Sequence, residues 1–325
     1  MRVVRQHRNP GRLDGLLVAA AWILLALGLV PYLHGYWWVL ELPAHFRLHL
    51  VGAAALVAVL AAWRGQRLAA ITGFVASAAC GAIVLAVPTG HASIRPGVTI
   101  ASQNLYFRNA DLDRLSAAID QADPDILVLQ EYTPEWHALL AAMAERYEAV
   151  IAVPRPGAFG IAIFSKLPIA TSEIIYPGDS GAPFIQAEFS TPQFSAHVIA
   201  VHFPAPTRHE WFATRQRQLS ALAAHLQEMD GPFVAIGDFN NTPAAPTLKN
   251  FVTATGAHLA APTWLATWPS ALGRAGIPID LAVGSGDVRF SGLTRLADVG
   301  SDHRGIRVSV AVEQHVDRPP LRTGQ

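Results

Sequence analysis

Residues 233–240 read Phe-Val-Ala-Ile-Gly-Asp-Phe-Asn. The four apolar residues at the start are typical of a short buried strand, and the polar residues Asp238 and Asn240 follow where that strand is expected to end. Burying such side chains costs free energy unless they have polar partners. The segment therefore predicts a core strand that carries a carboxylate and an amide to its end.

The same pattern, an apolar strand with a polar side chain at one end, recurs on both sides of this segment. The residues at these strand ends are Asn104, Glu131, His202, Asp280, Asp302 and His303. Any one of them alone is most simply a turn residue, but side chains at strand ends can converge on one rim. Three carboxylates meeting there (Glu131, Asp238 and Asp302) would repel one another unless a cation neutralised them. Oxygen ligands without cysteine favour Mg²⁺, Mn²⁺ or Ca²⁺ over structural zinc.

From residue 98 onwards, short apolar strands alternate with amphipathic helices. We expect strands at 98–103, 126–130, 160–164, 184–189, 195–202, 233–236, 279–283 and 305–312. We expect helices at 111–121 and 210–228. At least seven strands with few helices predict packed sheets covered by helices, rather than a single doubly wound sheet.

Composition divides the chain into two dissimilar parts. Hydrophobic residues make up 51% of the chain and charged residues 15%, which excludes a disordered or coiled-coil protein. Residues 1–97 carry eight basic and two acidic residues, whereas the remainder carries 16 basic and 22 acidic residues. The neutral chain therefore joins a basic, apolar third of net charge +6 to an acidic two-thirds of net charge −6.

Three uncharged apolar segments, 16–32, 48–63 and 68–87, lie in the first part. A helix needs about 20 apolar residues to cross roughly 30 Å of hydrocarbon, so we expect membrane spans at about 14–33, 46–64 and 68–87. A cleaved signal peptide is disfavoured by the two further apolar segments. Basic residues precede the first span (Arg2, Arg5, Arg8, Arg12) and connect the second to the third (Arg64, Arg67). Because basic residues stay cytoplasmic, we expect a multi-pass protein of the inner (cytoplasmic) membrane whose C-terminal domain is extracytoplasmic.

Five short motifs occur in a characteristic order: Gln103-Asn104, Leu129-Gln130-Glu131, Gly237-Asp238-Phe239-Asn240, Ile279-Asp280 and Ser301-Asp302-His303. In this order they resemble the endonuclease/exonuclease/phosphatase superfamily, over roughly residues 98–312, in a bacterial membrane-anchored branch. The resemblance implies a four-layer α/β sandwich, two packed mixed sheets flanked by helices, after three transmembrane helices. We accordingly expect an anchor at 1–90, a linker at 91–97, a catalytic domain at 98–313 and a polar tail at 314–325.

The resemblance also implies a metal centre and a general base. Glu131 would be the main ligand of Mg²⁺ (or Mn²⁺), with Asn104 and Asp302 beside the ion. His303 would activate the attacking water, and Asp280 would orient its imidazole, as a carboxylate does in other hydrolases.

Further roles follow from the same resemblance. Asp238 would hold the nucleophile or the leaving oxygen, while Asn240 and His202 would contact the phosphoryl group. Arg208 could bind a phosphate or headgroup, as could Arg215 and Arg217, although these arginines fit a solvated helix face equally well. His202 lacks an evident partner carboxylate, and Glu173 and Glu188 are candidates only by elimination.

These features predict a membrane-anchored, metal-dependent phosphoesterase that cleaves phosphodiester or phosphomonoester bonds, as a nuclease or as a lipid-headgroup phosphodiesterase. The net charge of −6 and the presence of only two lysines beyond residue 97 argue against tight binding of duplex DNA. No obligate protein partner is indicated. The alternative is a catalytically silent, membrane-tethered binding module with the same fold.

Overall fold

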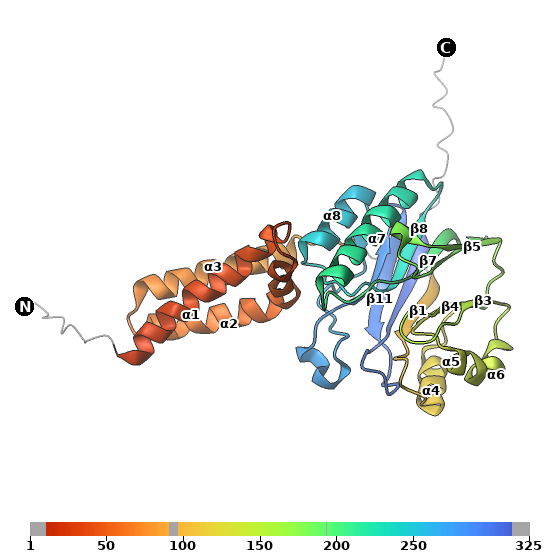
Figure 1. Ribbon diagram of the computed structural model, residues 1–325, viewed down its shortest axis with the longest axis horizontal. Coiled ribbons are helices and arrows are strands. Elements are labelled where there is room, and N and C mark those ends of the chain that lie inside the picture. Colours follow the sequence, from red (N-terminus) through yellow and green to blue (C-terminus); the bar gives the residue numbers. More distant parts are fainter. Residues whose placement is uncertain (1–10, 91–96, 193, 314–325) are drawn as a thin grey trace, which may run out of the picture. The chain divides into compact units, whose positions relative to one another are not determined.

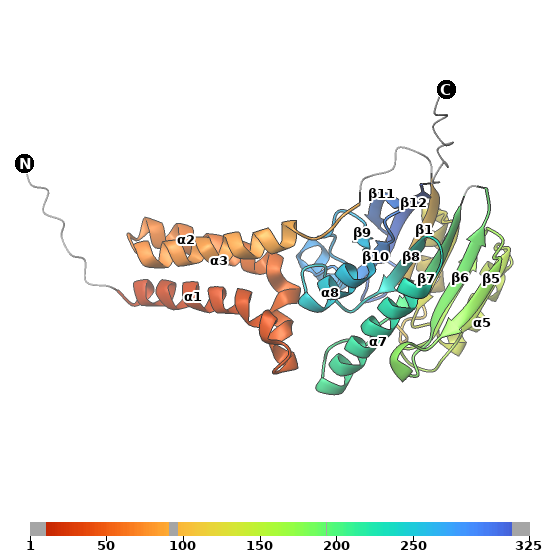
Figure 2. The same cartoon turned by 90° about the horizontal axis from the view of Figure 1, so that it is seen from above.

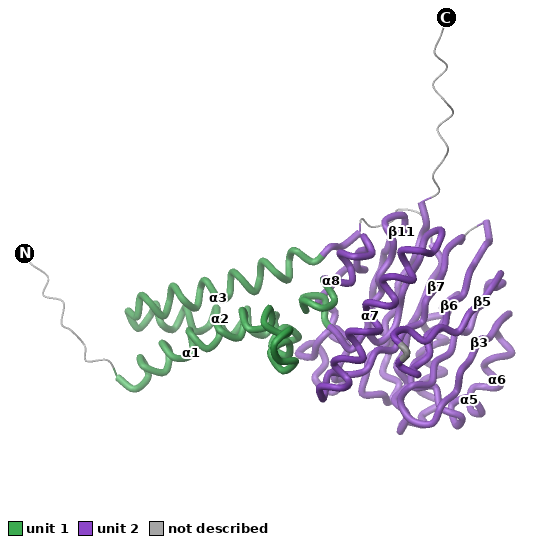
Figure 3. The backbone as a smooth tube through the Cα atoms, turned by 45° about the horizontal axis from the view of Figure 1, so that its top comes forward, with its two compact units in different colours: residues 1–87, 242–249 green, residues 88–241, 250–325 purple. Residues whose placement is uncertain are grey.

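The computed structural model describes residues 11–90, 97–192 and 194–313 of the chain (Figure 1). The described residues divide into two compact units, which Figure 3 shows in two colours. Unit 1 comprises residues 1–87 and 242–249, and unit 2 comprises 88–241 and 250–325. The first ten residues, most of the expected linker (91–96) and the expected tail 314–325 lie outside the described residues.

Unit 1 is built from apolar helices: α1 (Arg12–Leu29), η1 (Val30–Leu33), η2 (Trp38–Phe46), α2 (Arg47–Trp63) and α3 (Arg67–Leu85). Three helical segments, Arg12–Leu33, Trp38–Trp63 and Arg67–Leu85, are long and apolar enough to cross a membrane. Their mean hydropathies are 2.4, 1.8 and 2.2, and large apolar side chains are exposed on their surfaces. Nε of Arg64 lies 3.0 Å from Oδ1 of Asp14, so an ion pair joins the end of α2 to the start of α1.

Unit 2 contains two six-stranded mixed sheets. One has the order β11-β12-β1-β2-β4-β3: β1 (Val98–Asn104), β2 (Ile126–Gln130), β3 (Ala149–Val153), β4 (Ile161–Ser165), β11 (Val288–Arg295) and β12 (Ile306–Val312). The other has the order β5-β6-β7-β8-β10-β9: β5 (Thr171–Ile175), β6 (Phe184–Ser190), β7 (Ser195–His202), β8 (Phe233–Asp238), β9 (His258–Leu259) and β10 (Asp280–Gly284). Among the described strands, each sheet has only one parallel pair, β1 with β2 and β7 with β8.

The two sheets pack face to face through one apolar core. Ile100 and Val128 from the first sheet belong to the same buried cluster as Val198 and Val234 from the second. Successive side chains of a strand point to opposite faces, so Ala101 lies on the outer face of the first sheet. There Ala101 shares a second buried cluster with residues of α4 (Leu112–Ala122), α5 (Pro134–Leu139) and α6 (Ala141–Ala144).

The outer face of the second sheet is covered by α7 (His209–Glu228), which runs beside β7 and β8 in Figures 1 and 2. Ile185 and Ala187 of β6 point into the core between the sheets, so Gln186 points outward, and its Oε1 lies 2.6 Å from Nε2 of His225 on α7. α8 (Pro246–Thr255) packs near the end of β8, where the ring of Phe251 lies 6.4 Å from that of Phe239. The layers are therefore helix, sheet, sheet and helix. This confirms the predicted four-layer sandwich.

The structure adds strands that the sequence analysis did not predict: β3, β5, β9 and β11. Four of the five residues of β5 are exposed, so this edge strand lacks the apolar pattern that marks a core strand. β9 has only two residues. The predicted strands are confirmed to within one or two residues at each end.

Candidate active site

Four of the candidate residues lie at the carboxyl ends of the two parallel strand pairs. Asn104 ends β1, and Glu131 follows β2 directly. His202 ends β7 and is paired in register with Asp238 at the end of β8. The carboxyl ends of parallel strands open at one edge of a sheet. The two parallel pairs therefore bring an amide, two carboxylates and an imidazole to the same edge of the sandwich.

Two antiparallel strands add the remaining residues at this edge. Asp280 begins β10 directly opposite Asp238 in register. His303 precedes β12, which is antiparallel to β1. Oγ of Ser301 donates to the carbonyl oxygen of Asn104 at 2.7 Å and accepts from the backbone N–H of His303 at 3.0 Å. This serine fixes the loop that places His303 over the end of β1.

Asp238 is the centre of the resulting network and is fully buried. Its Oδ2 accepts hydrogen bonds from Nδ2 of Asn104 and from Nδ2 of Asn240, both at 3.1 Å. The same oxygen lies 3.4 Å from Nε2 of His202 and 3.7 Å from Nε2 of His303. Asp238 is therefore the carboxylate partner of His202.

His303 is held on its other side by Asp280. Nδ1 of His303 lies 3.0 Å from Oδ2 of Asp280, and both residues are buried. Oγ1 of Thr267 accepts from the backbone N–H groups of Ile279 and Asp280, at 3.1 Å each, and so fixes the start of β10. An imidazole with one nitrogen on a carboxylate and the other facing the site has the geometry of an oriented general base.

Burial and these contacts shift the pKa values of the site. Burial disfavours protonated His303, but the charges of Asp280 and Asp238 outweigh it and raise the pKa of His303 to about 10. Burial also opposes protonation of His202, whose pKa is nevertheless raised by the hydrogen bond and charge of Asp238. Burial raises the pKa of Asp280. Burial acts in the same direction on Asp238, but the charge of His303 and the hydrogen bond of His202 leave the pKa of Asp238 lowered.

Oxygen donors for a cation are present at this edge. Oε1 of Glu131 accepts from Nδ2 of Asn104 at 3.1 Å, and Oε2 accepts from the backbone N–H of Phe107 at 2.7 Å. Ligand atoms of Asp238, Asp280 and His303 all lie within 4.8 Å of one another. The set is rich in carboxylate and amide oxygen, which suits a hard divalent cation.

Asp302, the third residue expected at the metal, is held differently. Its Oδ2 accepts from Nε1 of Trp268 at 3.2 Å, whereas its Oδ1 is buried and has no hydrogen-bond partner among the described residues. Oδ1 of Asp280 is also buried without a hydrogen-bond partner among the described residues. Buried carboxylate oxygens without donors are costly, and a cation would satisfy such atoms.

The backbone is strained at the residues that carry these groups. Among the described residues, four that are not glycine have positive φ, and three of them lie here: Tyr106 (61°), Glu131 (56°) and Asn240 (44°). Such conformations cost free energy and concentrate at functional sites. Gly237 has φ 149°, and a Cβ at this position would overlap the carbonyl oxygen of Val201, which explains the glycine before Asp238.

The structure corrects two expectations about neighbouring residues. Glu173 and Glu188 are not partners of His202, because they lie on β5 and β6, where Glu188 accepts from Thr171. Arg215 does not lie on a solvated helix face. It is fully buried, and its Nη1 donates to the carbonyl oxygen of Asn240.

The other two arginines are exposed: Arg217 is bonded to Thr214, and Arg208 lies over the ring of Trp211 at 4.7 Å. A signal for the burial of Arg215 exists in the sequence. It occupies the spacing of the apolar stripe formed by Phe212, Leu219 and Leu222, where a charged residue is unexpected. Ser301 belongs to the quoted motif Ser301-Asp302-His303, but the sequence did not predict the hydrogen bonds that Ser301 and Thr267 form.

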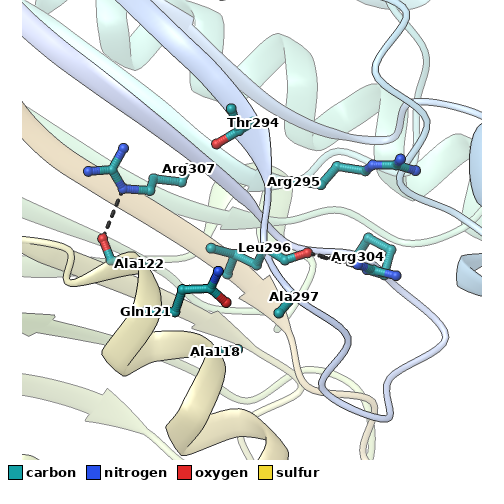
Figure 4. Close-up of a pocket in the computed structure, with 9 residues that line it drawn as sticks. All are labelled: Ala118, Gln121, Ala122, Thr294, Arg295, Leu296, Ala297, Arg304 and Arg307. Atoms are coloured by element: carbon teal, nitrogen blue, oxygen red, sulfur yellow. Dashed lines mark hydrogen bonds between the residues drawn. The ribbon is translucent and has the colours of Figure 1, made fainter.

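A pocket of about 370 Å³ lies elsewhere in unit 2, between α4 and the β11–β12 pair (Figure 4). Its charged lining residues are Arg295, Arg304 and Arg307. Nε of Arg307 donates to the carbonyl oxygen of Ala122 at 2.9 Å, and Nη2 of Arg304 donates to that of Leu296 at 3.0 Å (Figure 4). The pocket contains none of the candidate catalytic residues, so it is separate from the network around Asp238.

Solved structures with the same fold are numerous. An endonuclease/exonuclease/phosphatase from Beutenbergia cavernae DSM 12333 aligns with a TM-score of 0.52 and 18% identity, over 67% of this chain and 72% of that one. The human Nocturnin catalytic domain with bound sulfate aligns with a TM-score of 0.54 and 17% identity, over 68% and 96%. D. rerio TDP2 complexed with single strand DNA product aligns with a TM-score of 0.53 and 17% identity, over 66% and 99%.

No curated protein matches the sequence. The sequence model of the Endonuclease/Exonuclease/phosphatase family matches residues 101–303, a range that extends from β1 to His303 and includes the whole network around Asp238. Members of this family hydrolyse phosphate esters. On this match and on the fold, the chain belongs to the endonuclease/exonuclease/phosphatase family.

Proposed function

We propose that this protein is a divalent-metal-dependent phosphodiesterase of the nuclease type. The observation that carries the proposal is the position of His303, whose imidazole lies between Asp280 and Asp238 at the edge where the parallel strands end. All the polar groups that the chemistry needs are present around it. This completeness disfavours the alternative of a catalytically silent binding module.

The donor set supports the metal assignment. Glu131 would be the main ligand of Mg²⁺ or Mn²⁺, with Asn104 beside it; Asp238, which shares a hydrogen bond with Asn104, lies next to this pair. Asp302, with one unpartnered buried oxygen, would reach the ion directly or through water. When bound, the ion supplies positive charge to a phosphate oxygen and to the leaving group.

The residues of the chain would carry out the proton transfer and orient the reactants. In its neutral form, His303 accepts a proton at Nε2 from the attacking water as the water oxygen forms a bond to phosphorus and the bond to the leaving oxygen breaks. Asp280 holds the ring through Nδ1 and stabilises the imidazolium that forms. The raised pKa of His202 favours its protonated form, which suits a donor to a phosphoryl oxygen. Asn240 and Asp238 would position the phosphoryl group and the attacking or leaving oxygen.

The apolar helices support a place in the membrane. Arg12, Arg64 and Arg67 belong to the same end of unit 1, because α1 and α3 begin there and α2 ends there. With this basic end in the cytoplasm, three spans place residues beyond 88 outside the inner membrane. A green fluorescent protein fused to the C-terminus should stay dark there, and alkaline phosphatase at the same position should be active. Bright fluorescence would contradict this topology.

The enzymatic proposal is tested with the full chain in detergent. Hydrolysis of bis(p-nitrophenyl) phosphate should require Mg²⁺ or Mn²⁺ and should fall by about 10²–10⁴-fold in His303→Gln, the range typical of a general base. Glu131→Gln should lose metal-dependent activity. The matched controls are His137→Gln and Glu145→Gln, which change exposed residues of the same unit. Unchanged activity in both His303→Gln and Glu131→Gln would overturn the proposed function.

A further inference from the structure

Two groups of aromatic and arginine side chains adjoin the catalytic residues. The first, the Trp211 platform, consists of Phe159, Arg208 and Trp211. The ring of Phe159 lies 5.6 Å from the imidazole of His202 and 5.5 Å from the ring of Trp211, with interplanar angles of 38° and 41°. The guanidinium carbon of Arg208 lies 4.7 Å from the centre of the Trp211 ring. Phe159 and Trp211 are half-buried, and Arg208 is exposed.

The second group, the Phe107 platform, consists of Tyr106, Phe107 and Arg108. The backbone N–H of Phe107 donates to Oε2 of Glu131 at 2.7 Å, and the backbone N–H of Tyr106 donates to Oδ1 of Asn104 at 2.9 Å. The rings of Tyr106 and Phe107 are 5.6 Å apart, and the guanidinium carbon of Arg108 lies 5.1 Å from the Phe107 ring. Phe107 is 37% exposed, and Arg108 is exposed as well.

The two platforms adjoin opposite ends of one polar chain. Glu131 is hydrogen-bonded to Asn104, Asn104 to Asp238, and Asp238 lies against His202. The Phe107 platform adjoins Glu131 and Asn104, whereas the Trp211 platform adjoins His202. A phosphate bound beside this chain, at His202 and Asn240, would therefore have an aromatic and arginine platform toward each end of the chain.

Neither platform has the properties of core packing. The aromatic side chains of the core beside this edge, such as Phe203 and Phe239, are fully buried, while those of the platforms are half-buried or exposed. In the described part of the chain, neither Arg108 nor Arg208 is ion-paired with a carboxylate, so both cations stay available to an anion. An aromatic face with an adjacent guanidinium matches a nucleobase and its phosphate.

We propose that the two platforms bind the nucleotides on either side of the scissile phosphate, which makes single-stranded nucleic acid the substrate. The inference rests on the proposed function. Base faces are open to stacking only when the strand is unpaired. A choline headgroup fits less well, because the guanidinium beside each ring would repel its quaternary ammonium. The net charge of −6 beyond residue 97 also disfavours duplex DNA, whose binding depends on many phosphate contacts.

The test compares two substrates that differ only in their bases. One is a single-stranded oligothymidylate of roughly ten nucleotides, a length within the usual site size of single-strand binding proteins. The other is an oligonucleotide of the same length with abasic residues, which has the same charge. With the full chain in detergent and Mg²⁺ present, wild type should show a lower KM for oligothymidylate. In Trp211→Ala and in Phe107→Ala, this preference should fall about tenfold, since each variant removes one stacked base.

Two further sets of variants separate stacking from loss of structure. Trp264→Ala removes a tryptophan that is 56% exposed and belongs to neither platform, and should leave both KM values unchanged. Trp211→Phe should restore most of the preference. Arg108→Gln and Arg208→Gln should raise both KM values alike and should each reduce the dependence of KM on salt, because these residues contact phosphate rather than base. The arginine variants change exposed side chains, so they stay informative if an alanine variant fails to fold.

The outcomes distinguish failure of the base-binding platforms from failure of the proposed phosphodiesterase function. The proposal that the platforms bind bases would be overturned if Trp211→Ala and Phe107→Ala raised both KM values equally. It would also be overturned if Trp264→Ala reduced the preference for oligothymidylate as much as they do. Faster cleavage of phosphatidylcholine or phosphatidylglycerol vesicles than of oligothymidylate would assign the site to lipid headgroups. In either case, His303-dependent hydrolysis of bis(p-nitrophenyl) phosphate would leave the proposed phosphodiesterase intact. Loss of that dependence would instead remove the proposed function.

Discussion

Nδ1 of His303 lies 3.0 Å from Oδ2 of Asp280, although 23 residues separate the two in the chain. β10 and the segment before β12 bring the two residues together, and both are buried. The other nitrogen of the ring is left facing Asp238 at 3.7 Å. An imidazole held in this way presents one defined nitrogen to the site, and this relationship supports most of the following predictions.

Replacing Asp280 by Asn should reduce kcat by about 10²–10⁴-fold. The amide cannot stabilise the imidazolium that forms when His303 takes a proton, and it can turn the ring so that the wrong nitrogen faces the site. Steady-state kinetics on bis(p-nitrophenyl) phosphate measure the effect. Asp113→Asn, at an exposed position on α4, is the control and should be neutral. A kcat within twofold of wild type in Asp280→Asn would show that the carboxylate does not assist His303.

The metal-free protein should keep His303 protonated at neutral pH, because its pKa is raised to about 10. The NMR titration of its ring protons should therefore give a midpoint well above the ordinary 6.5. Asp238→Asn should lower this midpoint, since it removes one of the charges that raise it. Adding Mg²⁺ should lower it as well, because a cation offsets the same carboxylate. A midpoint near 6.5 in the metal-free wild type would contradict the prediction.

The same shift links stability to pH. The folded pKa of His303 exceeds the unfolded value, so its contribution is fully present below about 6.5 and is lost as pH rises through 10. The melting temperature of the metal-free wild type should therefore fall between pH 6.5 and 10. The corresponding fall in His303→Gln should be smaller. Parallel curves for the two proteins would exclude this linkage.

Binding of Mg²⁺ or Mn²⁺ should stabilise the folded chain independently of catalysis. At a metal concentration one hundred times the Kd, the gain is about 2.7 kcal/mol. Thermal unfolding in detergent, with and without metal, measures it. Glu131→Gln should remove most of the gain, whereas Glu145→Gln, which changes an exposed residue, should retain it. A gain of the same size in both variants would place the metal away from Glu131.

Arg215 is predicted to act as a positioning residue for Asn240. It is fully buried and donates to the carbonyl oxygen of Asn240, whose φ of 44° is strained. Arg215→Gln should lower kcat roughly tenfold and unfolding free energy by about 1–3 kcal/mol, because a buried carbonyl loses its donor. Arg215→Lys should recover part of kcat. The control is Arg217→Gln, which changes an exposed arginine two residues further along α7 and should change neither kcat nor the free energy of unfolding.

Gly237→Ala should lower the free energy of unfolding by about 2–4 kcal/mol, through overpacking and a strained φ. The added methyl would overlap the carbonyl oxygen of Val201 between β7 and β8. Gly286→Ala is the control, because a Cβ there meets no atom within 4 Å. Chemical denaturation of both variants checks the contrast. Equal stability would show that the two strands can separate without cost.

The order of the elements was predictable from local patterns, and the exceptions have physical causes. Apolar runs such as 126–130 and 233–236 indicate strands because they are buried on both faces. β5 and β9 carry no such pattern, since one is exposed and the other has two residues. The buried position of Arg215 was misjudged because a charged side chain on a helix is usually solvated.

The sequence by itself determined the types of the chemical groups at the site, because polar residues at the ends of apolar strands are costly unless they gain partners. It also determined the three apolar helices, because long uncharged apolar segments indicate helices of membrane-spanning length. Only the tertiary structure decided which groups are partners. The register of three strands places His202, Asp238 and Asp280 side by side, and a carboxylate 36 residues beyond His202 becomes its partner in place of Glu173 or Glu188. Strand register depends on packing across the whole core, and no local pattern contains it.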